Sequence, residues 1–72
     1  MEEKIGVAEI YMASINQSID IVAKESEFNK FRNEMYDRVR EYVKIFDEDA
    51  KMLQIFKREM ILCAIFTPTI DY

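Results

Sequence analysis

Hydrophobic residues recur in the first part of this chain at spacings of three and four, which is the period of one face of an α-helix. The residues of this seam are Ile5, Ala8, Met12, Ile15, Ile19 and Val22. Glu9, Asn16 and Asp20 fall on the opposite side of the same helix. The pattern predicts an amphipathic helix over residues 3–23.

A second stripe with the same period follows, and it is broad and aromatic. It consists of Phe28, Phe31, Met35, Val39, Tyr42 and Phe46. Ser26 is placed to cap the N-terminus of this helix, and Glu27 would lie favourably in its first turn. The stripe predicts a helix over residues 27–46.

A third stripe of helical period predicts a helix over residues 48–66. Its main positions are Leu53, Phe56, Met60 and Cys63. Asp47 or Asp49 would cap its N-terminus, and Pro68 would stop it, which leaves residues 67–72 as a short tail. The second and third helices could also merge into one long helix, because no glycine or proline separates them.

The breaker residues favour the same fold class. No glycine or proline occurs between Gly6 and Pro68, whereas strands joined by tight turns usually need them. We therefore predict a single all-α domain, a small three-helix bundle. A chain of 72 residues buries only about 60% of the surface that it exposes when unfolded, yet half of these residues are hydrophobic. We expect the bundle to complete its core as a homo-oligomer, with a dimer favoured.

The end of the third predicted helix carries most of the excess apolar surface. The line of Gln54 and Arg58 continues into Ile61 and Ile65, so the last turns are hydrophobic on every side. Such a helix is normally buried all round. We expect an interface made of Ile61, Leu62, Ile65 and Phe66, with a second candidate in the first seam, at Ile5, Met12, Ile15 and Ile19.

The side chains offer little for catalysis or for metal binding. Histidine, the commonest acid–base catalyst and metal ligand, is absent. The single cysteine, Cys63, lies in an apolar run, so we expect it to be buried and structural. The acidic run from Asp47 to Asp49 resembles the start of a calcium loop, but Met52 stands where the loop needs glycine. We predict no catalytic residue, no cofactor and no metal site.

Charge and hydropathy restrict the partners and the compartment. The formal net charge is −4, which argues against nucleic acid as a general partner. The longest apolar run, residues 60–66, is far shorter than the roughly 20 residues that span a bilayer. The acidic start lacks the basic segment of a secretory signal, and a lone cysteine forms no internal disulfide, so we expect a cytoplasmic protein outside the membrane.

These observations predict a function only as a class. We expect a non-enzymatic helical module for protein–protein interaction, a small adaptor or regulator that acts as a homo-oligomer. One alternative is a stoichiometric inhibitor that binds a larger protein through the apolar end of the third helix. Another is a dimeric DNA-binding protein that uses a face of the second helix carrying Arg38, Arg40 and Lys44.

Overall fold

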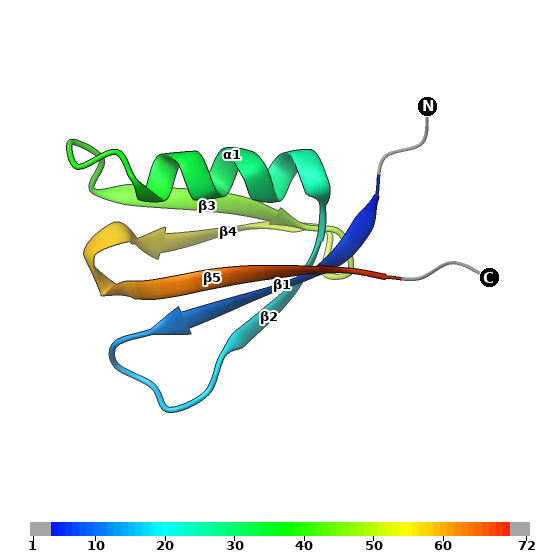
Figure 1. The fold of residues 1–72 in the computed structure, drawn as a ribbon, viewed down its shortest axis with the longest axis horizontal. Coiled ribbons are helices and arrows are strands. Elements are labelled where there is room, and N and C mark those ends of the chain that lie inside the picture. Colours follow the sequence, from blue (N-terminus) through cyan, green and yellow to red (C-terminus); the bar gives the residue numbers. More distant parts are fainter. Residues whose placement is uncertain (1–3, 70–72) are drawn as a thin grey trace.

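The computed structural model describes residues 4–69 and contains two small antiparallel sheets against which one α-helix packs (Figure 1). Its elements are β1 (Ile5–Met12), β2 (Ile19–Lys24), α1 (Glu25–Met35), β3 (Tyr42–Asp47), β4 (Met52–Lys57), the 3₁₀ turn η1 (Arg58–Met60) and β5 (Ile61–Pro68). The predicted all-α bundle, with helices over 3–23, 27–46 and 48–66, is therefore wrong. Only the first part of the second predicted helix is helical.

The strands form two separate ladders. One sheet has the order β2-β1-β5, with Ala8 opposite Ile21 on one side and Phe66 on the other. The register of β1 against β5 shifts by one residue after Tyr11, which leaves Leu62 as a bulge in β5. The second sheet is the β3–β4 hairpin. Because β5 pairs with β1, the two ends of the described chain are joined in one sheet.

The first predicted helix is a β-hairpin because its hydrophobic residues also satisfy a period of two. Ala8 and Ile10 of β1 and Ile21 and Ala23 of β2 alternate with exposed or half-buried residues along their strands. The helical seam had left Ile10, which is fully buried, on its polar side. As strands, the same residues place all four of these side chains on one face of the sheet, in the core.

The core lies between α1 and the inner faces of the two sheets. Its buried apolar residues are Ala8, Ile10, Ile21, Ala23, Phe28, Phe31, Val43, Ile45 and Phe56. The helix contributes two rings, and each meets an aromatic ring from a strand. Phe28 stacks on Phe66 with ring centroids 5.2 Å apart, and Phe31 meets Phe56 edge to face at 6.0 Å.

The β3–β4 hairpin turns without glycine. The Asp47 Oδ1 atom accepts hydrogen bonds from the backbone N–H groups of Asp49 (3.0 Å) and Ala50 (3.1 Å). Lys51 then adopts the left-handed conformation, with φ of 57°. The Asp47 side chain therefore accepts backbone amides as a helix N-cap would, but it does so in a hairpin turn. The lack of glycine does not exclude strands here.

The outer edge of β3 is closed by α1 and β2. The Lys44 N–H donates to Glu34 Oε1 (3.5 Å), and the Phe46 N–H donates to Glu27 Oε1 (3.2 Å). The next amide on the same edge, that of Glu48, donates to the Val22 carbonyl (2.7 Å). Helix carboxylates thus replace a neighbouring strand along β3.

Candidate functional site

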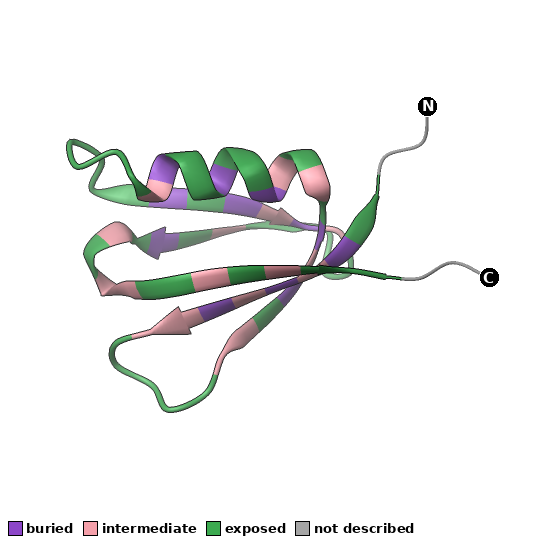
Figure 2. Ribbon diagram, in the orientation of Figure 1, coloured by how far each residue is buried: buried purple, intermediate pink, exposed green. Residues whose placement is uncertain are grey.

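The three-stranded sheet is covered by α1 on one face only (Figures 1 and 2). The residues that alternate with the core positions form its other face, which we term the outer sheet face. They are Ile5, Val7, Glu9 and Tyr11 of β1, Asp20, Val22 and Lys24 of β2, and Cys63, Ile65 and Thr67 of β5. All of them are exposed or half-buried.

The outer sheet face is unusually apolar for a surface in contact with solvent. Ile5 and Ile65 are 42% and 50% exposed, and Val7 lies opposite Val22, both half-buried. A one-sided antiparallel sheet normally presents polar residues to water. Contiguous apolar surfaces are a feature by which interaction sites are recognised, so the outer sheet face is the candidate site.

Two carboxylates lie side by side on the same face. Glu9 and Asp20 are directly opposite each other on β1 and β2. The Val22 carbonyl faces β3, so the pair of Val7 with Val22, and with it the pair of Glu9 with Asp20, is of the non-hydrogen-bonded type, with Cα atoms about 4.5 Å apart. None of the ion pairs within residues 4–69 involves either carboxylate. Together with Lys24, which lies on the same face, the two carboxylates give the outer sheet face a net charge of −1.

Hydroxyl groups hold both carboxylates in place. The Tyr11 hydroxyl donates to Glu9 Oε2 (3.0 Å), and the Ser18 hydroxyl donates to Asp20 Oδ1 (2.8 Å). The hydrogen bond to Glu9 and the negative charge of Glu9 raise the pKa of Tyr11 above its ordinary value. The carboxylates are thus oriented by their neighbours while remaining open to a cation from outside.

The structure separates the residues expected to form the interface. Ile5 and Ile65 lie on the outer sheet face, Leu62 is exposed at the bulge of β5, and Ile15 is exposed in the loop between β1 and β2. The remaining four are only partly exposed and pack against the core: Ile61, Phe66, Met12 and Ile19. No apolar end of a third helix exists for an inhibitor to use, because this segment is strand β5.

The expectation that Cys63 is buried is also wrong. The sequence predicted a buried thiol, but the side chain is exposed on β5, opposite Tyr11. The apolar neighbours Leu62 and Ala64, which suggested burial, lie at other positions of a strand, where adjacent side chains point to opposite faces. The side chain of the only cysteine of the chain therefore lies on the outer sheet face.

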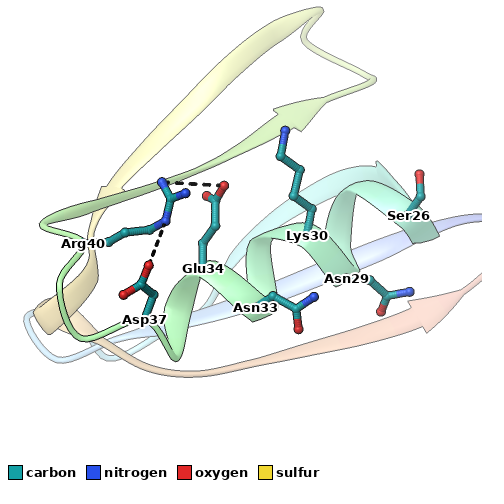
Figure 3. A pocket seen from close by; sticks show the side chains of 7 residues that line it. All are labelled: Ser26, Asn29, Lys30, Asn33, Glu34, Asp37 and Arg40. Carbon is teal, nitrogen blue, oxygen red and sulfur yellow. Dashed lines mark ion pairs between the residues drawn. The ribbon is translucent and has the colours of Figure 1, made fainter.

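A second surface feature is a shallow polar depression on the exposed side of α1 and the loop that follows it (Figure 3). Its lining residues are Ser26, Asn29, Lys30, Asn33, Glu34, Asp37 and Arg40. The Arg40 guanidinium lies 3.4 Å from an Asp37 oxygen and 3.9 Å from a Glu34 oxygen. The backbone carbonyl of Arg40 accepts a hydrogen bond from Arg58 Nε (2.8 Å). These bonds fasten the loop between α1 and β3 to its surroundings.

The three cations proposed to contact DNA do not share a helix face. Arg38 and Arg40 lie in the loop between α1 and β3, and Lys44 lies on β3. Arg40 is also neutralised by Asp37 and Glu34. The sequence could not show this, because it placed all three on one continuous helix.

The described residues form neither a metal-binding group nor a membrane-spanning helix. Within residues 4–69, no three histidine, cysteine, aspartate or glutamate side chains gather as a metal-binding group. In the same residues, no helix has the length and apolar character needed to cross a membrane. Comparisons with protein-family models, curated proteins and solved structures gave no match. The outer sheet face is therefore the feature of the described residues that bears most directly on function.

Proposed function

We propose that this chain is a non-enzymatic protein–protein interaction module, a small adaptor or regulator, and that it binds its partner with the outer sheet face. One observation carries the proposal: the three-stranded sheet leaves an apolar face, with Ile5, Val7, Val22 and Ile65, open to solvent. Covering such side chains would contribute about 25 cal/mol for each Å² of apolar surface removed from water. A sheet face is also a rigid platform, so little conformational entropy is lost on binding.

The charges of the outer sheet face define the partner's chemistry. Glu9 and Asp20 repel each other across the ladder, and like charges in directly opposite positions destabilise a sheet. An arginine or lysine of the partner, surrounded by aliphatic residues, would relieve that repulsion. The partner surface is therefore basic and apolar, which is consistent with the acidic net charge of the chain.

The proposed compartment is the cytoplasm. Cys63 is the only cysteine of the chain and is exposed, and an oxidising environment would convert such a thiol to a mixed disulfide or an intermolecular one. A reducing compartment leaves the outer sheet face unmodified and available to its partner.

Site-directed photo-crosslinking from Cys63 tests the proposed function. A thiol-linked photoreactive group on Cys63 should capture a partner in cells, and Ile65→Lys should abolish that capture because it charges the apolar face. Asn29→Lys, an equally exposed change on α1, is the matched control and should leave capture intact. If the product forms equally well with Ile65→Lys, or never forms with the parent chain, the outer sheet face is not a protein-binding surface.

A further inference from the structure

We propose that two copies of this chain dimerise through β4, which would join two β3–β4 hairpins into one four-stranded antiparallel sheet with a two-fold axis at Ile55. This surface is distinct from the outer sheet face, so the dimer does not depend on the function proposed above. Three features of β4 support this dimer: its open backbone edge, its exposed aliphatic side chains, and a register in which its one cation meets no like charge.

The backbone of β4 has an open edge. Because the Lys44 and Phe46 amides donate to α1, their pairs with Ile55 and Leu53 are of the non-hydrogen-bonded type. The N–H and C=O groups of Leu53 and Ile55 therefore point away from β3. In the described part of the chain, β4 pairs with β3 alone. Figure 3 agrees, since the pale yellow strand β4 lies on the far side of β3 from α1.

The side chains of β4 are also unusually exposed for an apolar strand. Leu53 is 47% exposed and Ile55 is 62% exposed, and both lie on the face of the hairpin away from the core. Only Phe56 of this strand is buried. An exposed apolar strand edge is a ready template for pairing with another chain.

The other strand edges of the described fold each carry an obstacle to strand addition that β4 lacks. β5 has a bulge at Leu62 and ends in Pro68, and both features discourage strand addition. The Val22 carbonyl on the edge of β2 is occupied by the Glu48 amide. β4 is a regular strand of six residues without proline, and Lys57 at its end is its only charge.

The register of the dimer follows from alternation and from charge. Residues that face the open edge must pair with one another, and the longest ladders result when the two-fold axis passes through Ile55 or Gln54, near the middle of β4. With the axis at Ile55, the partner's Lys57 lies opposite the uncharged Leu53, and each Lys57 keeps its 3.3 Å ion pair with Glu59 of its own chain. With the axis at Gln54, the partner's Lys57 would come beside Lys51, the turn residue that precedes β4, and like charges that close are unfavourable.

The Ile55 register also buries the exposed aliphatic side chains. Ile55 meets the partner's Ile55 across the axis, and Leu53 packs beneath the methylene stem of the partner's Lys57, whose ammonium group stays in water. The edge is thus complementary to itself, because its exposed aliphatic residues are covered and its one cation meets no like charge. A second copy of the chain is therefore the occupant that fits the edge.

Two matched substitutions test the dimer by sedimentation velocity over a range of protein concentrations. The parent chain should sediment at twice the monomer mass. Ile55→Glu places two carboxylates opposite each other on the axis and should raise the dissociation constant about 100-fold or more. Leu53→Glu places a carboxylate opposite the partner's Lys57, so the dimer should persist. Both side chains are exposed, so circular dichroism should show the same fold for each variant.

Disulfide formation between introduced cysteines tests which residues face each other across the two-fold axis. In a Cys63→Ser background, Ile55→Cys should oxidise readily to a covalent dimer, because the two cysteines face each other at the axis. Leu53→Cys should not, because the partner's Leu53 lies several residues along the sheet. A monomeric parent chain would overturn the proposal, as would equal loss of the dimer with Ile55→Glu and Leu53→Glu, or crosslinking at residue 53 rather than 55. A dimer that all these variants leave unchanged would place the interface elsewhere.

Discussion

Gly6 determines how closely β5 can approach β1. It pairs with Pro68, so the only glycine of the chain faces the only proline. The Thr69 N–H donates to the Ile5 carbonyl, which makes the pair of Gly6 with Pro68 a non-hydrogen-bonded one, and the missing N–H of Pro68 costs nothing there. A Cβ atom at Gly6 would lie 2.7 Å from the Pro68 Cα atom and 2.8 Å from the Phe66 ring, and it would also collide with the Thr67 carbonyl.

Gly6→Ala should therefore destabilise the fold by about 1–3 kcal/mol, the usual cost of overpacking. The crowding comes from backbone atoms of Thr67 and Pro68, which cannot rotate away as a side chain can. Urea unfolding of parent and variant measures the effect. Phe66→Leu removes the ring that crowds this position. In the Gly6→Ala background it should restore only a small part of the lost free energy of unfolding, because the backbone contacts remain. Unchanged stability of Gly6→Ala would show that β5 approaches β1 less closely.

Tyr11 should titrate above the ordinary tyrosine pKa of about 10. Its hydroxyl donates to Glu9, whose charge opposes formation of the phenolate, so the folded state holds this proton more tightly than the unfolded chain does. The resulting contribution to stability is present below the unfolded pKa and is lost as pH rises through the folded pKa. An NMR titration of the Tyr11 ring should show the raised pKa, and Glu9→Gln should lower it. A Tyr11 pKa that Glu9→Gln leaves unchanged would contradict this bond.

At the scale of elements, α1 takes the place of a strand beside β3. Glu27 and Glu34 are two helical turns apart on one side of α1, and their carboxylates accept the outward amides of Phe46 and Lys44. The helix therefore packs its aromatic rings into the core and closes an exposed sheet edge with the adjoining side. This second role fixes the height and direction of α1 relative to β3.

Glu27→Ala should destabilise the protein by about 1–2 kcal/mol, because it leaves the half-buried Phe46 amide without its acceptor. Hydrogen exchange at the Phe46 amide should become faster in the same variant. Glu25→Ala, a change of the same kind in the first turn of α1, is the control and should have a smaller effect on stability and none on that amide. Equal losses from the two substitutions would mean that the carboxylate of Glu27 serves only the helix terminus.

At the scale of the whole molecule, one helix is too few to cover two sheets. α1 shields the inner faces, while the outer sheet face and the edge of β4 stay in contact with water (Figure 2). Both surfaces carry aliphatic side chains that are exposed to solvent in the isolated chain. The molecule therefore has two separate places at which association would bury apolar area.

Cys63 should react rapidly with a thiol reagent in the native state, because its side chain is exposed on the outer sheet face. The labelling rate of the native chain should approach that of the urea-unfolded chain. Addition of a protein that binds the outer sheet face should slow labelling, whereas dimerisation through β4 should leave the rate unchanged. Slow labelling of the isolated native chain would show that β5 is covered.

Part of this structure was predictable from short stretches of sequence. The stripe that predicted a helix over residues 27–46 was right for its first members, Phe28, Phe31 and Met35, which lie on α1, and wrong for Tyr42 and Phe46, which lie on β3. The acceptor role of Asp47 was also visible, since its side chain bonds to amides two and three residues away. Among the expected interface residues, Ile5 and Ile65 lie on the outer sheet face, but on strands and not on the first and third helices from which the sequence predicted them.

The sequence by itself determined only local features of this protein: a helix that starts near residue 25, an acceptor role for the Asp47 side chain, and a large share of apolar residues for so short a chain. Only the tertiary structure decided whether residues 5–24 and 52–68 would be helices or strands. Their hydrophobic positions satisfy periods of both 3.6 and two, and a helix is stabilised by bonds within its own segment. A strand is stabilised by a partner, and the partner of Gly6 is Pro68, at the other end of the described chain.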